Sequence, residues 1–149
     1  MKKVNLILIL FTIIFQSCGN KDCDECFTPP QSFQFEIVNK ISGENLFTNG
    51  TYQSENIEIT NNLNNNESIE FTFISEDNNN LIEMSSIGWK TGVTDLKINI
   101  SGNHIFDLYV DAERKMGDCC SYTEYNEITI GESEFELDSQ NGIYKILVE

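Results

Sequence analysis

The strongest constraint on the fold is an alternation of apolar and polar residues along most of the chain. A period of two recurs in five segments, at 33–37, 57–60, 69–73, 96–100 and 106–110. Such alternation is typical of strands with one buried face, and after residue 18 no stretch repeats apolar residues at helical spacing. About eight to nine short strands separated by turns predict an all-β fold, an antiparallel β-sandwich of the Ig-like or prealbumin-like kind.

Local signals refine this prediction. Asn141-Gly142 is the strongest hairpin signal in the chain. The segment that follows, 143–148, is apolar on both faces, so we expect it to lie inside a sheet rather than at its edge. The polar segment 112–120 is interpreted as a long loop, and Trp89 as a plug in the core of the sandwich.

Residues 1–17 have the pattern of a secretory signal peptide. Lys2 and Lys3 precede a nearly unbroken apolar run from 4 to 15, and a short apolar run after a basic start is typical of secretion. The run is too short to cross a bilayer core of about 30 Å at about 1.5 Å per residue. Ser17-Cys18 resembles the lipobox of Gram-negative bacterial lipoproteins. This resemblance implies cleavage before Cys18 and its lipidation with a diacylglyceryl group and a fatty acyl chain such as palmitate.

The same resemblance implies a location in the cell envelope. In such lipoproteins an Asp directly after the lipidated cysteine retains the protein in the inner membrane, whereas this chain has Gly19. We therefore expect a lipid anchor in the outer membrane. Asp22, Asp24 and Glu25 also resemble the acidic signal that directs some of these lipoproteins to the cell surface.

Beyond the signal peptide, the sequence divides into a tether at 18–32 and a single sandwich domain at 33–149. The tether is acidic, carries two cysteines besides Cys18, and ends in paired prolines that favour an extended backbone. Roughly 130 residues suit one domain that buries about two thirds of its surface.

Four cysteines remain after Cys18, and an even number in an exported chain indicates disulfides. They form two close pairs, Cys23 with Cys26 and Cys119 with Cys120. A bridge between the last two would be strained, because adjacent Cα atoms lie about 3.8 Å apart and disulfides need about 4.4–6.8 Å. We therefore expect two bridges between the pairs, in either arrangement, that fasten the tether to one end of the sandwich. The alternatives are a four-thiolate zinc site and a thioredoxin-like redox site.

The charge of the chain excludes some partners. There are 9 basic and 24 acidic residues, for a net charge of −15, whereas phosphate binding requires a basic face. Nucleic acid is therefore not an expected partner, and direct adsorption to anionic lipid is disfavoured. The lipid anchor would have to hold the protein on the membrane.

The sequence has no recognisable catalytic motif. His104 is the single histidine, so a Ser-His-Asp or Cys-His site would need it, and no Gly-x-Ser-x-Gly, HExxH or phosphate-loop pattern is present. A closed pocket holding His104 beside two carboxylates would favour a hydrolase. The acidic segments 111–118 and 138–141 could hold calcium, but we interpret them as solvated turns, and we expect neither a metal nor another cofactor.

Four aromatic residues could form a ligand-binding face, because flat rings supply amphipathic contact area. They are Trp89, Tyr109, Tyr122 and Tyr125. Tyr109 is out of phase with the apolar residues around it, so we expect it to be exposed. An exposed platform of such rings would favour glycan binding.

Phe35-Glu36-Ile37, followed by Ser42-Gly43-Glu44-Asn45-Leu46, resembles the opening strand and turn of carboxypeptidase-regulatory-like sandwich modules. This resemblance again implies a β-sandwich. The sequence favours a membrane-anchored binding or structural module of the cell envelope, not an enzyme, with an envelope protein or a glycan as its partner. The alternatives are an accessory glycan-binding subunit of a nutrient-capture complex and a hydrolase.

Overall fold

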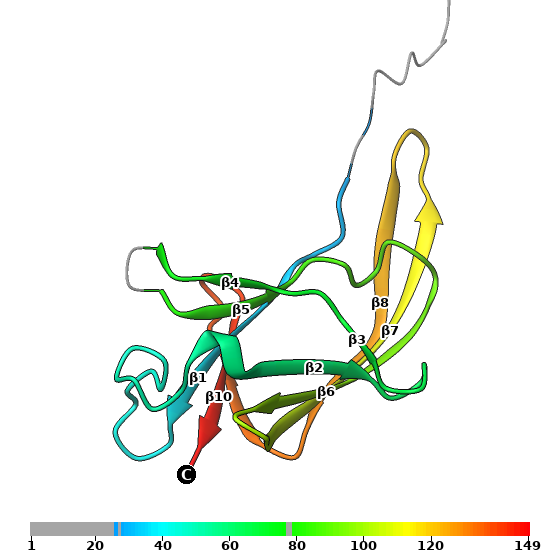
Figure 1. Ribbon diagram of the computed structural model, residues 1–149. Helices are drawn as coiled ribbons and strands as arrows, with labels where there is room; N and C mark the ends of the chain where they lie inside the picture. The colour runs from blue at the N-terminus through cyan, green and yellow to red at the C-terminus, as the bar shows by residue number, and fades with distance from the viewer. Residues whose placement is uncertain (1–25, 27, 77–78) are drawn as a thin grey trace, which may run out of the picture.

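The computed structural model describes residues 26, 28–76 and 79–149. The strands are β1 (Phe33–Asn39), β2 (Ile57–Asn61), β3 (Glu67–Ser68), β4 (Thr72–Ile74), β5 (Leu81–Met84), β6 (Gly92–Ile100), β7 (Asn103–Met116), β8 (Ser121–Gly131), β9 (Glu134–Leu137) and β10 (Ile143–Val148), with the 3-10 turn η1 (Ser54–Asn56) before β2. They form two five-stranded sheets, which confirms the predicted β-sandwich (Figure 1). Sheet A has the order β4-β5-β1-β10-β9, and sheet B has the order β3-β2-β6-β7-β8.

The core lies between the sheets and is built from the inward-facing residues of both. Phe35 of β1 and Phe106 of β7 are fully buried, and their ring centroids lie 4.9 Å apart across the interface. The alternation detected in the sequence supplies this layer, because every second residue of a strand points to the same face. No buried polar or charged residue occurs among the described residues. Burial of apolar surface, worth about 25 cal/mol per Å², therefore holds the sheets together.

One strand pair departs from the antiparallel pattern. β1 and β10 run parallel, with Phe35 opposite Tyr144 and Ile37 opposite Ile146. β10 lies between β1 and β9, as its two apolar faces predict, and β9 and β10 form the hairpin expected at Asn141-Gly142. The first and last strands of the domain thus meet in the middle of sheet A.

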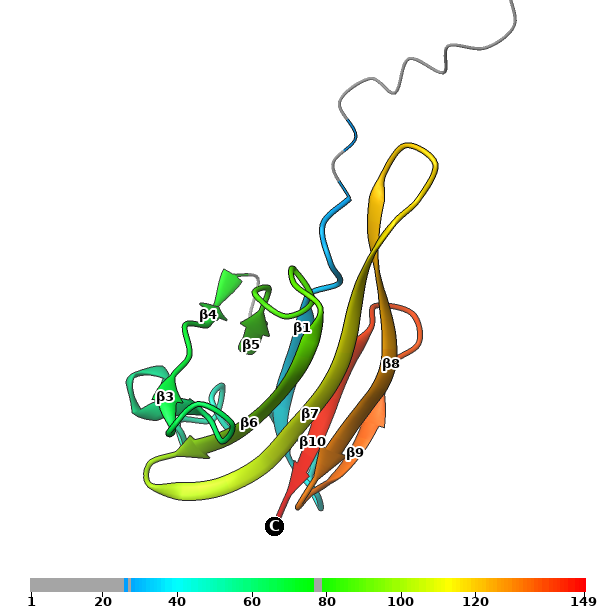
Figure 2. The same cartoon turned by 90° about the vertical axis from the view of Figure 1, so that its right-hand side faces the viewer.

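Two interpretations of the sequence are wrong. Segment 112–120 is not a long loop, because β7 continues to Met116 and β8 begins at Ser121. This hairpin projects beyond the body of the sandwich in Figure 1 and Figure 2, so its side chains are polar because solvent surrounds it. Segment 69–73 is not a single strand, because the chain leaves sheet B after Ser68 and enters sheet A at Thr72.

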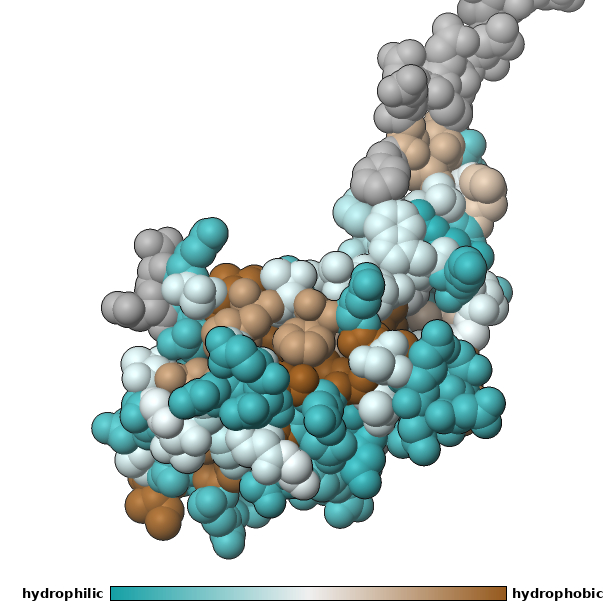
Figure 3. Space-filling view, in the orientation of Figure 1, coloured by the Kyte–Doolittle hydropathy of each residue, from teal (hydrophilic) through white to brown (hydrophobic). Residues whose placement is uncertain are grey.

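The segment that crosses between the sheets closes one open edge of the sandwich. Figure 3 shows mostly hydrophilic surface, with an apolar band between the edges of the two sheets. Ile69 and Phe71 of the crossing segment and Phe73 of β4 are half-buried and pack against the core. Edge strands of a sandwich need such cover, since they otherwise expose core residues and unpaired backbone groups.

A β-bulge at the base of the projecting hairpin changes which face of sheet B its side chains point to. Asp111 of β7 pairs with Glu127 of β8, and the next residue, Ala112, pairs with Tyr125, which leaves Asn126 as an extra residue. An extra residue on one strand reverses the in–out alternation beyond it and increases the local twist. Tyr125 therefore points to the inner side of sheet B, together with buried Ala112.

Candidate functional site

The N-terminal segment lies beside the projecting β7–β8 hairpin. We call residues 26 and 28–32 the arm. A disulfide joins Cys26 of the arm to Cys120 at the tip of the hairpin, with a Cα–Cα distance of 5.3 Å and a sequence separation of 94. This is one of the crossed bridges expected from the sequence, and it excludes a bridge between residues 119 and 120. Cys119 is also disulfide-bonded, whereas Cys18 and Cys23 lie outside the described residues.

Arg114 in β7 is the polar centre of the junction between arm and hairpin. Its guanidinium donates hydrogen bonds to the carbonyl oxygen of Thr28 at 2.8 Å and to the hydroxyls of Thr123 and Ser121 at 2.9 and 3.0 Å. Its carbon Cζ lies 5.7 Å from the ring centroid of Trp89, a cation–π contact worth about 0.5–1 kcal/mol when exposed. Arg114 thus links the arm, the hairpin and the loop before β6.

Sequence reasoning missed Arg114. It is the single arginine of a strongly acidic chain, and this rarity is the sequence signal that could have marked it as a structural centre. Only a planar guanidinium presents several donors in a fixed fork, so it can bond three separate oxygens and stack on a ring together.

Tyr125 holds the end of the arm against the core. Its hydroxyl donates to the carbonyl oxygen of Gln31 at 3.3 Å, and its ring meets the ring of Phe33 edge-on at a centroid distance of 5.6 Å. Burial raises the pKa of the Tyr125 phenol, so the hydroxyl keeps its proton at neutral pH. Tyr125 is therefore part of the arm junction, not an exposed ligand-binding ring.

Gly88 allows the arm and the hairpin to approach each other. Its φ is +88°, and a Cβ built on it would lie 2.8 Å from the Tyr125 hydroxyl, 2.9 Å from Thr123 and 3.3 Å from Pro30. Both the left-handed backbone and the crowding require glycine at this position.

The four aromatic candidates do not form one platform. The expectation that Trp89 plugs the core is wrong: the residue is 42% exposed, and its indole Nε1 donates to the carbonyl oxygen of Ser85. Trp89 packs on Arg114, and Tyr122 pairs with Lys115, the next residue of β7. Because successive residues of a strand point to opposite faces, Trp89 and Tyr122 lie on opposite sides of the hairpin.

Tyr109 lies apart from the other three rings. It faces outward from sheet B, as its phase predicts, with Asp95 of β6 and Thr129 of β8 directly opposite it. It is half-buried rather than fully exposed. The four rings therefore do not combine into the glycan-stacking platform considered from the sequence.

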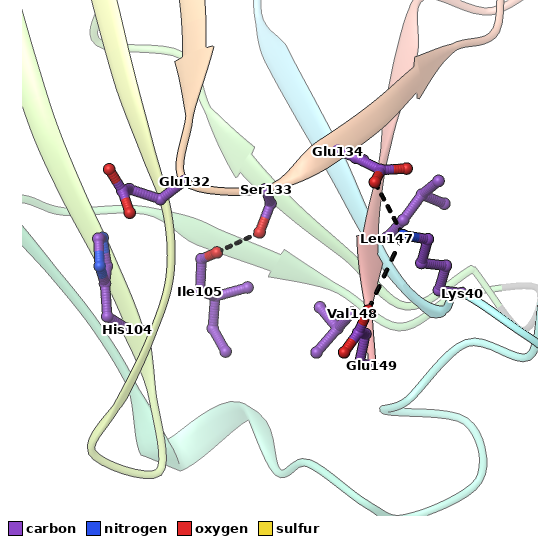
Figure 4. A pocket seen from close by; sticks show the side chains of 9 residues that line it. All are labelled: Lys40, His104, Ile105, Glu132, Ser133, Glu134, Leu147, Val148 and Glu149. Carbon is purple, nitrogen blue, oxygen red and sulfur yellow. Dashed lines mark hydrogen bonds and ion pairs between the residues drawn. The ribbon is translucent and has the colours of Figure 1, made fainter.

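An open hollow of about 460 Å³ lies at the other end of the sandwich (Figure 4). It is lined by Lys40, His104, Ile105, Glu132, Ser133, Glu134, Leu147, Val148 and Glu149. Figure 4 shows His104 and Glu132 on one side and Lys40 with two carboxylates on the other. In Figure 1 the arm and the C-terminal end of β10, which borders the hollow, lie at opposite ends of the domain.

The polar groups of the hollow are bonded to one another. Lys40 Nζ lies 2.8 Å from Glu134 and 3.9 Å from Glu149, and the hydrogen bond to Glu134 raises the pKa of Lys40. The amine therefore stays protonated and is not a nucleophile. Ser133 donates its hydroxyl proton to the carbonyl oxygen of Ile105, and His104 pairs with Asp107 at 2.8 Å.

In this arrangement the Ser133 hydroxyl and the His104 imidazole have separate partners. A hydroxyl nucleophile needs a base within hydrogen-bond reach, whereas the proton of Ser133 points to a backbone carbonyl. Within the part of the chain that the structure describes, no three His, Cys, Asp or Glu side chains gather to hold a metal ion. No helix among those residues is long and apolar enough to span a bilayer.

Comparison with protein-family models, with curated proteins and with solved structures finds no match to this chain.

The arm junction yields a paired prediction. Gly88 and Gly50 both have positive φ, +88° and +80°, but only at Gly88 would a Cβ meet other atoms. We expect Gly88→Ala to lower the free energy of unfolding by about 1–3 kcal/mol more than Gly50→Ala, because overpacking adds to the shared backbone strain. Urea denaturation of both variants measures the difference, and equal losses would contradict the described packing of the arm.

The hollow yields a second prediction. The pair of His104 and Asp107 lies at the surface, where such pairs contribute about 0–1 kcal/mol. We expect His104→Ala to change the free energy of unfolding by less than about 1 kcal/mol and to leave the circular dichroism spectrum unchanged. Asp107→Asn serves as the control that removes the same pair from its other side. A hydrolytic activity of the native protein that disappears in His104→Ala would show that the histidine is catalytic.

Proposed function

We propose that the protein is a lipid-anchored binding module of the cell envelope, held at the outer membrane through Cys18. The observation that carries this proposal is the covalent attachment of the arm to one end of a rigid sandwich through Cys26 and Cys120. A tether that serves only as a flexible linker does not need to be bonded to the domain. An arm fixed by a disulfide, Arg114 and Tyr125 instead transmits the orientation of the anchor to the whole domain.

The proposed orientation follows from the two ends of the sandwich. The arm leaves the domain beside the hairpin tip, and the C-terminal end of β10 lies at the opposite end (Figure 1), where it borders the hollow around Lys40 and Glu134. A lipid at Cys18 would turn the hairpin tip towards the membrane and the hollow away from it. The acidic surface supports this arrangement, because repulsion from anionic head groups keeps the body away from the bilayer.

A binding role is favoured over catalysis by the chemistry of the hollow. Its hydroxyl, amine and imidazole are each engaged by a neighbouring carbonyl or carboxylate. Preformed partners of this kind suit recognition of polar groups at low reorganisation cost, whereas hydrolysis needs a free nucleophile beside a base.

Lipidation is the first test of this proposal. Each buried methylene contributes about 0.8 kcal/mol, so two or three acyl chains would hold the protein on a membrane permanently. We expect the native protein to partition into the detergent phase of a Triton X-114 extraction and Cys18→Ala to remain an uncleaved precursor or a soluble product. Cys26→Ser is the matched control, since it removes a thiol without touching the proposed lipid site. Native protein in the aqueous phase would refute the lipid anchor.

The second disulfide is a further test. We expect Cys119 to bond Cys23. This second bridge would attach the tether to the hairpin at residue 23 as well as at residue 26 and would leave Cys18 free for lipid. Non-reducing digestion of envelope protein should link the fragments around 23–26 to the fragment that holds both 119 and 120, and partial reduction with alkylation should then assign 26 to 120 and 23 to 119. A self-contained bridge between 23 and 26, or four free thiols, would instead favour a redox or zinc role.

A further inference from the structure

The two edges of the sandwich are not closed alike. One is covered by the segment that crosses from β3 to β4. At the other, a tight turn joins the end of β8 to the start of β9. Each is the outermost strand of its sheet. We call residues 126–138 the β8–β9 edge.

Core-facing side chains remain exposed along the β8–β9 edge. Ile128 lies opposite fully buried Val110, so it points to the inner side of sheet B. Phe135 and Leu137 lie opposite buried Ile146 and Tyr144, so they point to the inner side of sheet A. Yet the three are 36%, 44% and 52% exposed, since no further strand covers them among the described residues.

The same edge is rich in acidic residues, although Lys40 is bonded to Glu134 and Lys145 lies opposite Glu136 on β10. Residues 126–138 include no lysine or arginine and five acids, Glu127, Glu132, Glu134, Glu136 and Asp138. Three exposed apolar side chains are thus interleaved with carboxylates along two strands whose outer backbone edges are unpaired in the described part of the chain. An unpaired strand edge is a template for another strand, and the flanking side chains select which one.

We propose that the β8–β9 edge binds an extended segment of a partner protein in which apolar and basic residues alternate. The segment pairs with β8 as a sixth strand of sheet B. Its inward apolar side chains cover Ile128, Phe135 and Leu137, and its outward basic side chains face Glu127 and the acidic outer surface of the sheet. This inference rests on the binding role proposed above but not on the lipid anchor.

Charge complementarity selects this occupant over two others. A second copy of this chain would bring an identical acidic edge against the first, and like charges opposite each other across strands are destabilising. A lipid surface with anionic head groups is repelled for the same reason. A basic alternating segment satisfies the backbone edge of β8, the apolar side chains and Glu127 together.

The test uses purified full-length protein and a synthetic peptide of about eight residues in which valine alternates with lysine. Two control peptides carry glutamate in place of lysine, or methyl groups on alternate backbone nitrogens. We expect binding of the lysine peptide by fluorescence anisotropy, and binding at least about tenfold weaker for each control, because one loses the charge match and the other the strand pairing.

Protein variants locate the site. Leu137→Ser and Ile128→Ser should each weaken binding of the lysine peptide about tenfold, whereas Leu63→Ser, which alters a 60% exposed leucine elsewhere, should not. Glu127→Gln should weaken it about threefold, with Glu58→Gln on β2 as its control. Unchanged urea midpoints would show that all variants remain folded.

Several outcomes overturn the proposal. They are no binding at millimolar peptide, equal binding of the glutamate or methylated peptide, and indifference to both serine variants at the edge. Self-association that Leu137→Ser abolishes, seen by analytical ultracentrifugation, would assign the edge to a second copy instead. The lipid plays no part in this assay, so failure here leaves the detergent partitioning result standing, and failure of partitioning leaves this one standing.

Discussion

The contact between the two inner faces is the constraint on which the rest of the structure depends. No polar or charged residue is fully buried among the described residues, so the sheets are held by apolar packing such as that of Phe35 on Phe106. Packing of this kind needs cover on every side, because any residue of the layer that reaches an edge meets water. The crossing segment with Phe71 provides this cover on one side. The incomplete cover of Leu137 on the other is therefore a meaningful feature of the fold.

The polar contacts are concentrated at the two ends of the sandwich, where they serve different purposes. At one end Arg114 and the Cys26–Cys120 disulfide bind a segment that contributes nothing to the sheets, so they fix geometry rather than build the core. At the other end the ion pair of Lys40 and Glu134 holds the start of β9 against the residue that follows β1. The polar contacts at one end therefore fix the arm, and those at the other end fix the start of β9.

Much of the fold could be predicted because strand alternation is local, whereas the junction could not because it depends on contacts far apart in sequence. The hairpin at Asn141-Gly142 is confirmed, since turn chemistry is encoded by adjacent residues. The bulge at Asn126 could not be anticipated, and it alone decides that Tyr125 faces inward. Trp89 was assigned to the core because large rings are usually buried, but its partner Arg114 lies on another strand.

The parallel pairing of β1 with β10 also governs when the domain can form. Phe35 belongs to the first strand made and Tyr144 to the last, so the centre of sheet A cannot be completed before almost the whole chain is available. Pairing between such distant segments is intrinsically slow. Sheet A of a nascent chain therefore stays incomplete until synthesis reaches β10, whereas every strand of sheet B is made before it. The order of the strands thus makes closure of sheet A over the core one of the last steps of folding.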